Sequence, residues 1–129
     1  MSNRISIMVT SGTLERLQMA AMVASVSAVS GNEVTVFLSM NALPHFRKGA
    51  SDPAPAEGQM GKLLVEKKAP PFKQLFENAV ELGDAKIFPC SMAMDILGYD
   101  KNDVEPYVGE SMGLTKFLDN ARDAQIWSF

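Results

Sequence analysis

The side chain with the strongest nucleophilic chemistry in this sequence is the thiol of Cys90, the single cysteine among 129 residues. It follows an apolar run at residues 85–89 and precedes a helix-forming stretch that begins at Ser91. This places the thiol where a buried strand ends and a helix begins, the edge of a parallel sheet at which ligand sites gather. Backbone N–H groups and the dipole of the following helix would favour a thiolate there. A thiolate at this position would be able to attack a sulfane sulfur and hold it as a persulfide.

A structural role for the same cysteine is the competing interpretation. An isolated cysteine in an apolar sequence is often a small buried hydrophobe. One cysteine forms neither an internal disulfide nor a Cys-x-x-Cys pair, so a dithiol cycle within one chain is excluded. A reduced, cytoplasmic compartment is the simplest setting for it. With one histidine and one cysteine, no closed structural metal site is expected.

Three residues that follow the cysteine are candidate binding residues. Ser91, Met92 and Met94 lie on the expected helix 91–97. The two thioethers would give bound sulfur a soft, polarizable wall, whereas the alternative is ordinary filling of gaps in the core.

His45, Ser11 and Gly12 are candidates at other positions. His45 is the only histidine, and it would act as a base or hydrogen-bond donor if segment 41–47 folds over the same sheet edge. A surface histidine without a role is the alternative. The Ser11-Gly12 turn after the first strand would bind a phosphate in a flavin- or nucleotide-binding module, although such turns are also common starts of helices.

Strands alternate with helices along the chain, which predicts an α/β fold with a parallel sheet covered on both faces. Residues 1–129 are expected to form a single domain, with an irregular insert loop near 48–69 that is rich in Gly, Pro, Ala and Ser. Strands are expected at 5–10, 34–38, 85–89 and 125–129 with a short one from Val108, and helices at 14–30, 41–47, 72–82, 91–97 and from Ser111 to 121.

The first long helix has two kinds of surface. Its larger apolar residues recur at helical spacing and are expected to face the core. Ala and Ser over much of the rest predict close packing, with another subunit as one candidate partner. Gly31 and Gly83 are expected to end their helices, and Thr13 is a candidate N-cap. The stripe expected in the core consists of Leu14, Leu17, Ala21, Met22, Val26 and Val29.

Composition excludes several classes of function. The formal net charge of −3 gives no basic field for holding nucleic acid. The most apolar stretch, 19–29, is too short to span a bilayer, and the N-terminus lacks the features of a secretory signal. No nucleic-acid partner and no membrane span are therefore expected.

The segment 88–98 reads Phe-Pro-Cys-Ser-Met-Ala-Met-Asp-Ile-Leu-Gly. It resembles the cysteine motif of DsrE/DsrF-like proteins, in particular the branch with a Cys-x-Met-x-Met-Asp-x-x-Gly pattern. The opening strand, the Ser11-Gly12 turn, the Ala- and Met-rich first helix and the second strand also look like that family. Only the insert at 48–69 matches it poorly.

The resemblance implies both a fold and a function. The fold would be a flavodoxin-like three-layer sandwich with a mostly parallel sheet of about five strands, assembled as a homo-oligomer. The protein would be a cytoplasmic sulfur carrier with sulfurtransferase character and no cofactor, holding persulfide or thiosulfonate sulfur on Cys90. Its partners would be a rhodanese-like donor and a TusA-like acceptor. A non-catalytic oligomeric scaffold and a flavin- or nucleotide-binding module remain as alternatives.

Overall fold

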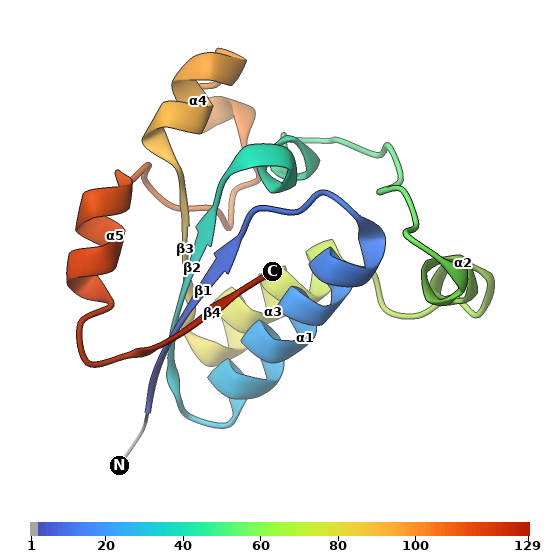
Figure 1. Cartoon of the computed structure of the whole chain (residues 1–129), viewed down its shortest axis with the longest axis horizontal. Helices are drawn as coiled ribbons and strands as arrows, with labels where there is room; N and C mark the ends of the chain where they lie inside the picture. The colour runs from blue at the N-terminus through green and yellow to red at the C-terminus, as the bar shows by residue number, and fades with distance from the viewer. Residues whose placement is uncertain (1–2) are drawn as a thin grey trace.

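The computed structural model of the chain describes residues 3–129. Its four strands are parallel neighbours in the order β3-β2-β1-β4, and Figure 1 shows helices on both sides of them. This confirms the predicted α/β fold with a parallel sheet. The elements are β1 (Arg4–Val9), α1 (Leu14–Val29), β2 (Glu33–Leu38), η1 (Met40–Phe46), α2 (Gln59–Glu66), α3 (Phe72–Gly83), β3 (Lys86–Pro89), α4 (Ser91–Leu97), η2 (Lys101–Asp103), α5 (Leu114–Asn120) and β4 (Gln125–Ser128).

The sheet has four strands, and the short strand expected from Val108 is an irregular stretch along the outer edge of β3. Within this edge segment, residues 109–112, the Gly109 N–H donates to the Ile87 carbonyl at 2.7 Å. A Cβ at Gly109 would stand 3.0 Å from that same oxygen, so a glycine permits the close approach. The segment makes a single β-bridge, between Met112 and Cys90. It therefore covers the edge of β3 without forming a regular strand.

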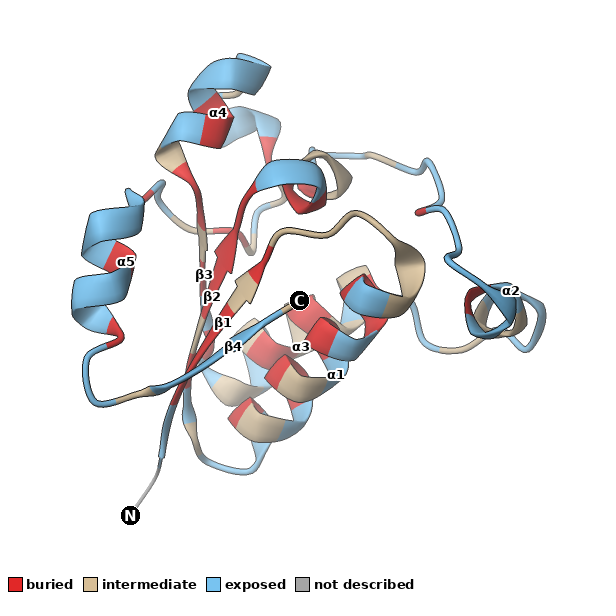
Figure 2. Cartoon of the chain, viewed as in Figure 1, coloured by how far each residue is buried: buried red, intermediate tan, exposed pale blue. Residues whose placement is uncertain are grey.

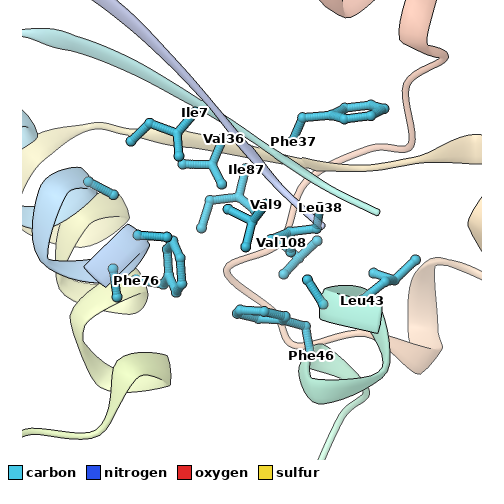
Figure 3. Close-up of a cluster of buried hydrophobic side chains, with 14 of the residues drawn as sticks. Ile7, Val9, Val36, Phe37, Leu38, Leu43, Phe46, Phe76, Ile87 and Val108 are labelled. Carbon is cyan, nitrogen blue, oxygen red and sulfur yellow. The ribbon is translucent and has the colours of Figure 1, made fainter. Parts of the chain in front are cut away.

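Successive side chains of a strand point to opposite faces of the sheet, so both faces carry apolar side chains that need covering. A separate layer of helices covers each face. Val36 and Ile87 point toward α3, where they join Phe46 and Phe76 in the cluster of Figure 3. Phe37 lies between Val36 and Leu38 on β2 and points to the other face, where its ring stacks on Phe117 of α5 with centroids 4.8 Å apart. The core thus lies mainly between the sheet and the α1–α3 layer, with a smaller cluster under α5.

The prediction for the buried face of α1 is correct for Leu17 and Ala21, both 0% exposed, and wrong for the three larger residues toward its end. Met22, Val26 and Val29 are exposed, at 44%, 66% and 61%, while the buried residues of the helix are mostly small. Figure 2 shows buried positions recurring along the helix beside α3. A Cβ built on Gly83 of α3 would stand 2.5 Å from the Ala28 Cβ, so the two helices approach more closely than large side chains would allow. The predicted close packing of Ala and Ser therefore occurs within this chain, against α3.

Both glycines expected at helix ends lie there, but only one of them adopts the left-handed conformation. Gly31 follows α1 with a φ of 96°, the left-handed conformation expected of a C-terminal glycine. Gly83 is the last residue of α3, as expected, and Asp84 directly after it adopts the left-handed conformation, with a φ of 58°. Asp tolerates this region better than most residues. The N-cap residue of α5 is Gly113. The expected cap, Ser111, lies two residues earlier and does not occupy that position.

The segment expected to be an irregular loop contains a helix, α2, at Gln59–Glu66. Its start is fixed to α1 by the Glu15 carboxylate, which accepts backbone N–H groups of Glu57, Gly58 and Gly61 at 2.7, 2.8 and 3.0 Å. An acidic group from elsewhere in the chain thus satisfies donors that a short helix leaves open. A helix anchored by a distant residue has no local capping signal, which is why the sequence pattern missed it.

Thr13 precedes α1 as predicted, yet its side chain does not cap that helix. Its hydroxyl donates instead to the Glu57 carboxylate at 2.5 Å, which also receives the Arg16 guanidinium at 3.0 Å.

No helix within residues 3–129 is long and apolar enough to cross a membrane.

Candidate functional site

Cys90 lies at the junction between β3 and α4. Its N–H donates to the Leu38 carbonyl at 2.8 Å, which extends the pairing of β3 with β2 by one residue. Its own carbonyl accepts the Met94 N–H at 2.9 Å and so begins α4, for which Cys90 is the N-cap residue. The thiol therefore occupies the carboxyl edge of the sheet, at the strand-to-helix turn expected from the sequence.

The thiol is nearly enclosed in the isolated chain, since Cys90 is 5% exposed. Strand alternation places its side chain on the same face as Phe88, whose partner in the register is Phe37, and hence on the α5 side of the sheet. The Ser91 N–H donates to the Met112 carbonyl at 3.0 Å. One of the backbone donors expected to face the sulfur is thus already bonded to the edge segment.

The methionines near the thiol separate into two environments. Met92 is 53% exposed and points to solvent, whereas Met94 is 5% exposed and belongs to the core. The structure therefore does not bring them together as two sides of one wall. Met112, which is 7% exposed and bridged to Cys90, is the thioether residue that sequence analysis missed. Its pairing joins segments 22 residues apart, and no local pattern reports such a contact.

The Ser11-Gly12 turn lies at the same edge of the sheet but on a different strand, and most of its backbone donors are already used. The Ser11 N–H donates to the Phe129 carbonyl at 3.2 Å, and the Leu14 N–H donates to the Pro55 carbonyl at 2.9 Å. The Thr13 N–H donates to the Ser11 hydroxyl at 3.3 Å. A phosphate site needs free N–H groups at a helix start. The turn is occupied by bonds within the chain.

Packing and charge at this turn also oppose a bound phosphate. A Cβ at Gly12 would lie 2.7 Å from the Asn41 carbonyl oxygen, so the glycine serves close packing against η1. Glu15 and Glu57 place two carboxylates beside the start of α1. The backbone N–H groups of Glu57, Gly58 and Gly61 hold the pKa of Glu15 below its ordinary value, which keeps that carboxylate charged.

His45 is brought to Gly12, not to Cys90. Its Nε2 lies 3.1 Å from the Gly12 carbonyl oxygen, and its ring stands edge-on to Phe72 with centroids 6.1 Å apart. Phe72 belongs to α3, on the face of the sheet opposite the one toward which Cys90 points. The predicted role of His45 as a base for the thiol therefore has no geometric support. Residues 3–129 also bring together no three His, Cys, Asp or Glu side chains that could hold a metal ion.

Comparison with known proteins places this geometry in a family. Residues 53–129, more than half of the chain and including β3, Cys90 and α4, match the model of the DsrE/DsrF/DrsH-like family. The chain belongs to this family, as its cysteine motif indicated. No curated protein matches the chain by sequence.

Two solved structures share the fold over nearly the whole chain. The ychN protein from E. coli matches with a TM-score of 0.71 and 16% identity, covering 100% of both chains. The protein of unknown function MTH1491 from Methanobacterium thermoautotrophicum matches with a TM-score of 0.60 and 9% identity, covering 99% of this chain and 100% of its own. At these identities the likeness concerns the fold alone, which is flavodoxin-like with a parallel sheet between helical layers.

Proposed function

We propose that this protein is a sulfur carrier that holds sulfane sulfur as a persulfide on Cys90 and relays it between protein thiols. Membership of the DsrE/DsrF-like family indicates a role in sulfur relay. The observation that carries the finer proposal is the position of Cys90, which is the single thiol and stands at the carboxyl edge of the sheet at the start of α4. No other side chain of the chain could carry sulfur in this way.

The transfer consists of two balanced exchanges. In the first, the Cys90 thiolate attacks the outer sulfur of a donor persulfide, a new S–S bond forms on Cys90, and the donor leaves as its thiolate. In the second, an acceptor thiolate attacks the terminal sulfur of the Cys90 persulfide. The terminal sulfur stays on the acceptor, and Cys90 leaves as a thiolate. No external oxidant or reductant is consumed. The donor would be a rhodanese-like protein and the acceptor a TusA-like protein, in the cytoplasm, with the carrier assembled as a homo-oligomer.

Access to the thiol is the step that its burial makes slow. At 5% exposure, Cys90 cannot meet a bulky donor without local movement. The edge segment is the element to move, since three hydrogen bonds hold it to the junction: Gly109 to Ile87, Met112 to Pro89, and Ser91 to Met112. Local opening of a short irregular segment costs less than global unfolding. A docking partner that displaces residues 109–112 would expose the sulfur only at the moment of transfer.

A chase experiment tests the relay. The protein is loaded with sulfane sulfur from polysulfide and desalted, an acceptor thiol protein is added, and the sulfane sulfur on each protein is followed over time by cyanolysis. Transfer that depends on Cys90 supports the proposal, with Cys90→Ser as the matched control. Sulfur that stays on the protein, or that the serine variant transfers equally, contradicts it.

The burial of Cys90 favours one alternative, an oligomeric scaffold in which the cysteine only fills space. The two functions differ in the rate at which a thiol reagent labels the native protein. A carrier requires labelling by local opening, far faster than global unfolding, whereas a scaffold allows labelling only at the unfolding rate. The flavin or nucleotide module is not favoured, because the donors of the Ser11-Gly12 turn are bonded within the chain.

A further inference from the structure

A cavity of about 300 Å³ lies beside the α1–α3 layer, away from the cysteine. Its walls come from the start of α1, η1, the loop 50–54, α2 and the start of α3. Figure 1 shows α2 standing apart from the sheet, with a loop leading to it on either side. Cavities of this size bind small molecules when apolar walls surround a few placed polar groups.

The walls of the cavity are chiefly apolar. Leu14 of α1 and Phe72 of α3 line it from the body of the protein, and Leu64 and Val65 line it from α2. Val65 is 65% exposed, a large unburied area for an aliphatic side chain. An apolar ligand between these walls would remove that area from water, which is a favourable change.

Two polar side chains in the wall have unused acceptors. Gln18 is 6% exposed and donates its amide nitrogen to the Pro70 carbonyl at 2.8 Å, so its oxygen is left without a partner among residues 3–129. The Gly12 carbonyl can only accept, so the His45 Nε2 that bonds it carries the proton. In the neutral ring, Nδ1 then keeps a free lone pair. Both unused atoms are acceptors, and they call for a ligand that donates hydrogen bonds.

The charges around the cavity balance, which argues against a strongly charged ligand. Asp52 and Lys68 are both wall residues and have opposite signs. Lys73, the other cation of the wall, is paired with Glu105 at 2.5 Å. An ionic ligand would therefore find no excess of opposite charge to offset its loss of water.

We propose that this cavity binds an uncharged small molecule with an apolar body and a hydrogen-bond donor, such as a phenol, an alcohol or a primary amide. The molecule lies between Phe72 and the α2 residues Leu64 and Val65, and its donor faces the Gln18 oxygen or the His45 Nδ1. Without a ligand, α2 is held to the body of the protein by its flanking loops and by the Glu15 hydrogen bonds. A bound ligand would add a second attachment, because it contacts both α2 and α3. This site is separate from the sulfur relay, because Cys90 points to the opposite face of the sheet.

Nuclear magnetic resonance titration with 4-propylphenol tests the site on the full chain. We expect saturable shifts centred on the amides of Leu14, Leu64 and Val65. The methyl ether 4-propylanisole has the same body and no donor, and it should bind about tenfold more weakly, the effect of one unmatched buried acceptor. Equal affinity for the two probes would overturn the assignment of the acceptors, and shifts centred elsewhere, or none that saturate, would overturn the site.

Two variants of α2 provide the matched controls. Val65→Asp places a charge on the cavity wall and should weaken 4-propylphenol at least about tenfold. Met60→Asp changes a residue of similar exposure, 62%, on the same helix but outside the cavity, and should bind as the wild type does. Equal weakening by both variants would contradict the proposal. Cys90→Ser should leave binding unchanged, so failure of the cavity proposal and failure of the sulfur relay are told apart.

Discussion

Cys90 and Met112 form a parallel β-bridge at the outer edge of β3. The Met112 N–H donates to the carbonyl of Pro89, directly before the cysteine, at 2.9 Å, and the Met112 carbonyl accepts the N–H of Ser91, directly after it, at 3.0 Å. One residue of the edge segment thus bonds to both neighbours of the thiol. We therefore expect that exposure of the sulfur requires the release of Met112.

The first prediction concerns that coupling. Met112→Ala removes a side chain that is 7% exposed and weakens the packing of the edge segment. Labelling of Cys90 by a thiol reagent should become at least about tenfold faster, which corresponds to roughly 1.4 kcal/mol of easier local opening. Met92→Ala, at an exposed position two residues after the thiol, is the control and should label at the wild-type rate. Unchanged labelling of Met112→Ala would show that another element governs access.

The second prediction concerns the contact between α1 and α3. Gly83→Ala would ordinarily favour a helix, but here the new Cβ meets the Ala28 Cβ at 2.5 Å and its backbone carbon at 2.7 Å. We expect a loss of about 1–3 kcal/mol in the free energy of unfolding, measured in urea. Gly58→Ala, where a Cβ meets nothing within 4 Å, should change that free energy little. A more stable Gly83→Ala protein would mean that the helices separate easily.

The third prediction concerns pH and the start of α2. Backbone N–H bonds lower the pKa of Glu15 from its ordinary value near 4.5. A group whose pKa is lowered by folding stabilises the folded state above its unfolded pKa, and this contribution is lost as the pH falls through the folded pKa. The amide resonances of Gly58 and Gly61 should therefore move on acidification below about pH 4.5 in the wild type. Glu15→Gln should abolish that titration and Glu66→Gln should not; an identical titration in Glu15→Gln would refute the anchor.

The fourth prediction concerns Tyr107, whose buried hydroxyl has no hydrogen-bond partner among the described residues. Burial, with smaller contributions from Glu105 and Glu77, raises the pKa of this phenol well above its ordinary value. Tyr107→Phe removes an unsatisfied polar group and should leave the free energy of unfolding unchanged or raise it by about 1 kcal/mol. Because folding raises the phenol pKa, its part of the stability is present below pH 10 and declines above it, and the phenylalanine variant should lose this alkaline decline. A clear loss of stability at neutral pH would reveal a bond to the hydroxyl.

Much of the fold follows from local sequence signals. Apolar runs marked the strands at 5–10, 34–38 and 85–89, and glycine and proline marked where helices begin and end. The strand-to-helix junction at Cys90 was visible for the same reason, since a buried run ends there in Pro89 and helix formers follow. These signals are local, so they can be recognised in the sequence before any tertiary contact is known.

The features that sequence analysis missed depend on contacts between distant segments. Side-chain size pointed to Met22 and Val26 as the buried face of α1, but the fit between Ala28 and Gly83 determined which face packs. The bridge from Met112 to Cys90 and the bond from His45 to Gly12 likewise join separate segments. Sequence analysis makes His45 a candidate partner for the thiol because it is the only histidine. The sheet topology is needed to show that His45 and the Cys90 thiol lie on opposite faces of the sheet.

Intact mass spectrometry after treatment with polysulfide tests the central claim most directly, because it asks whether Cys90 itself accepts sulfur. The account predicts that native wild-type protein gains the mass of one or more sulfur atoms, that a reductant removes them, and that Cys90→Ser gains none. A wild-type protein that stays unmodified while folded, or a serine variant that gains the same mass, would contradict it.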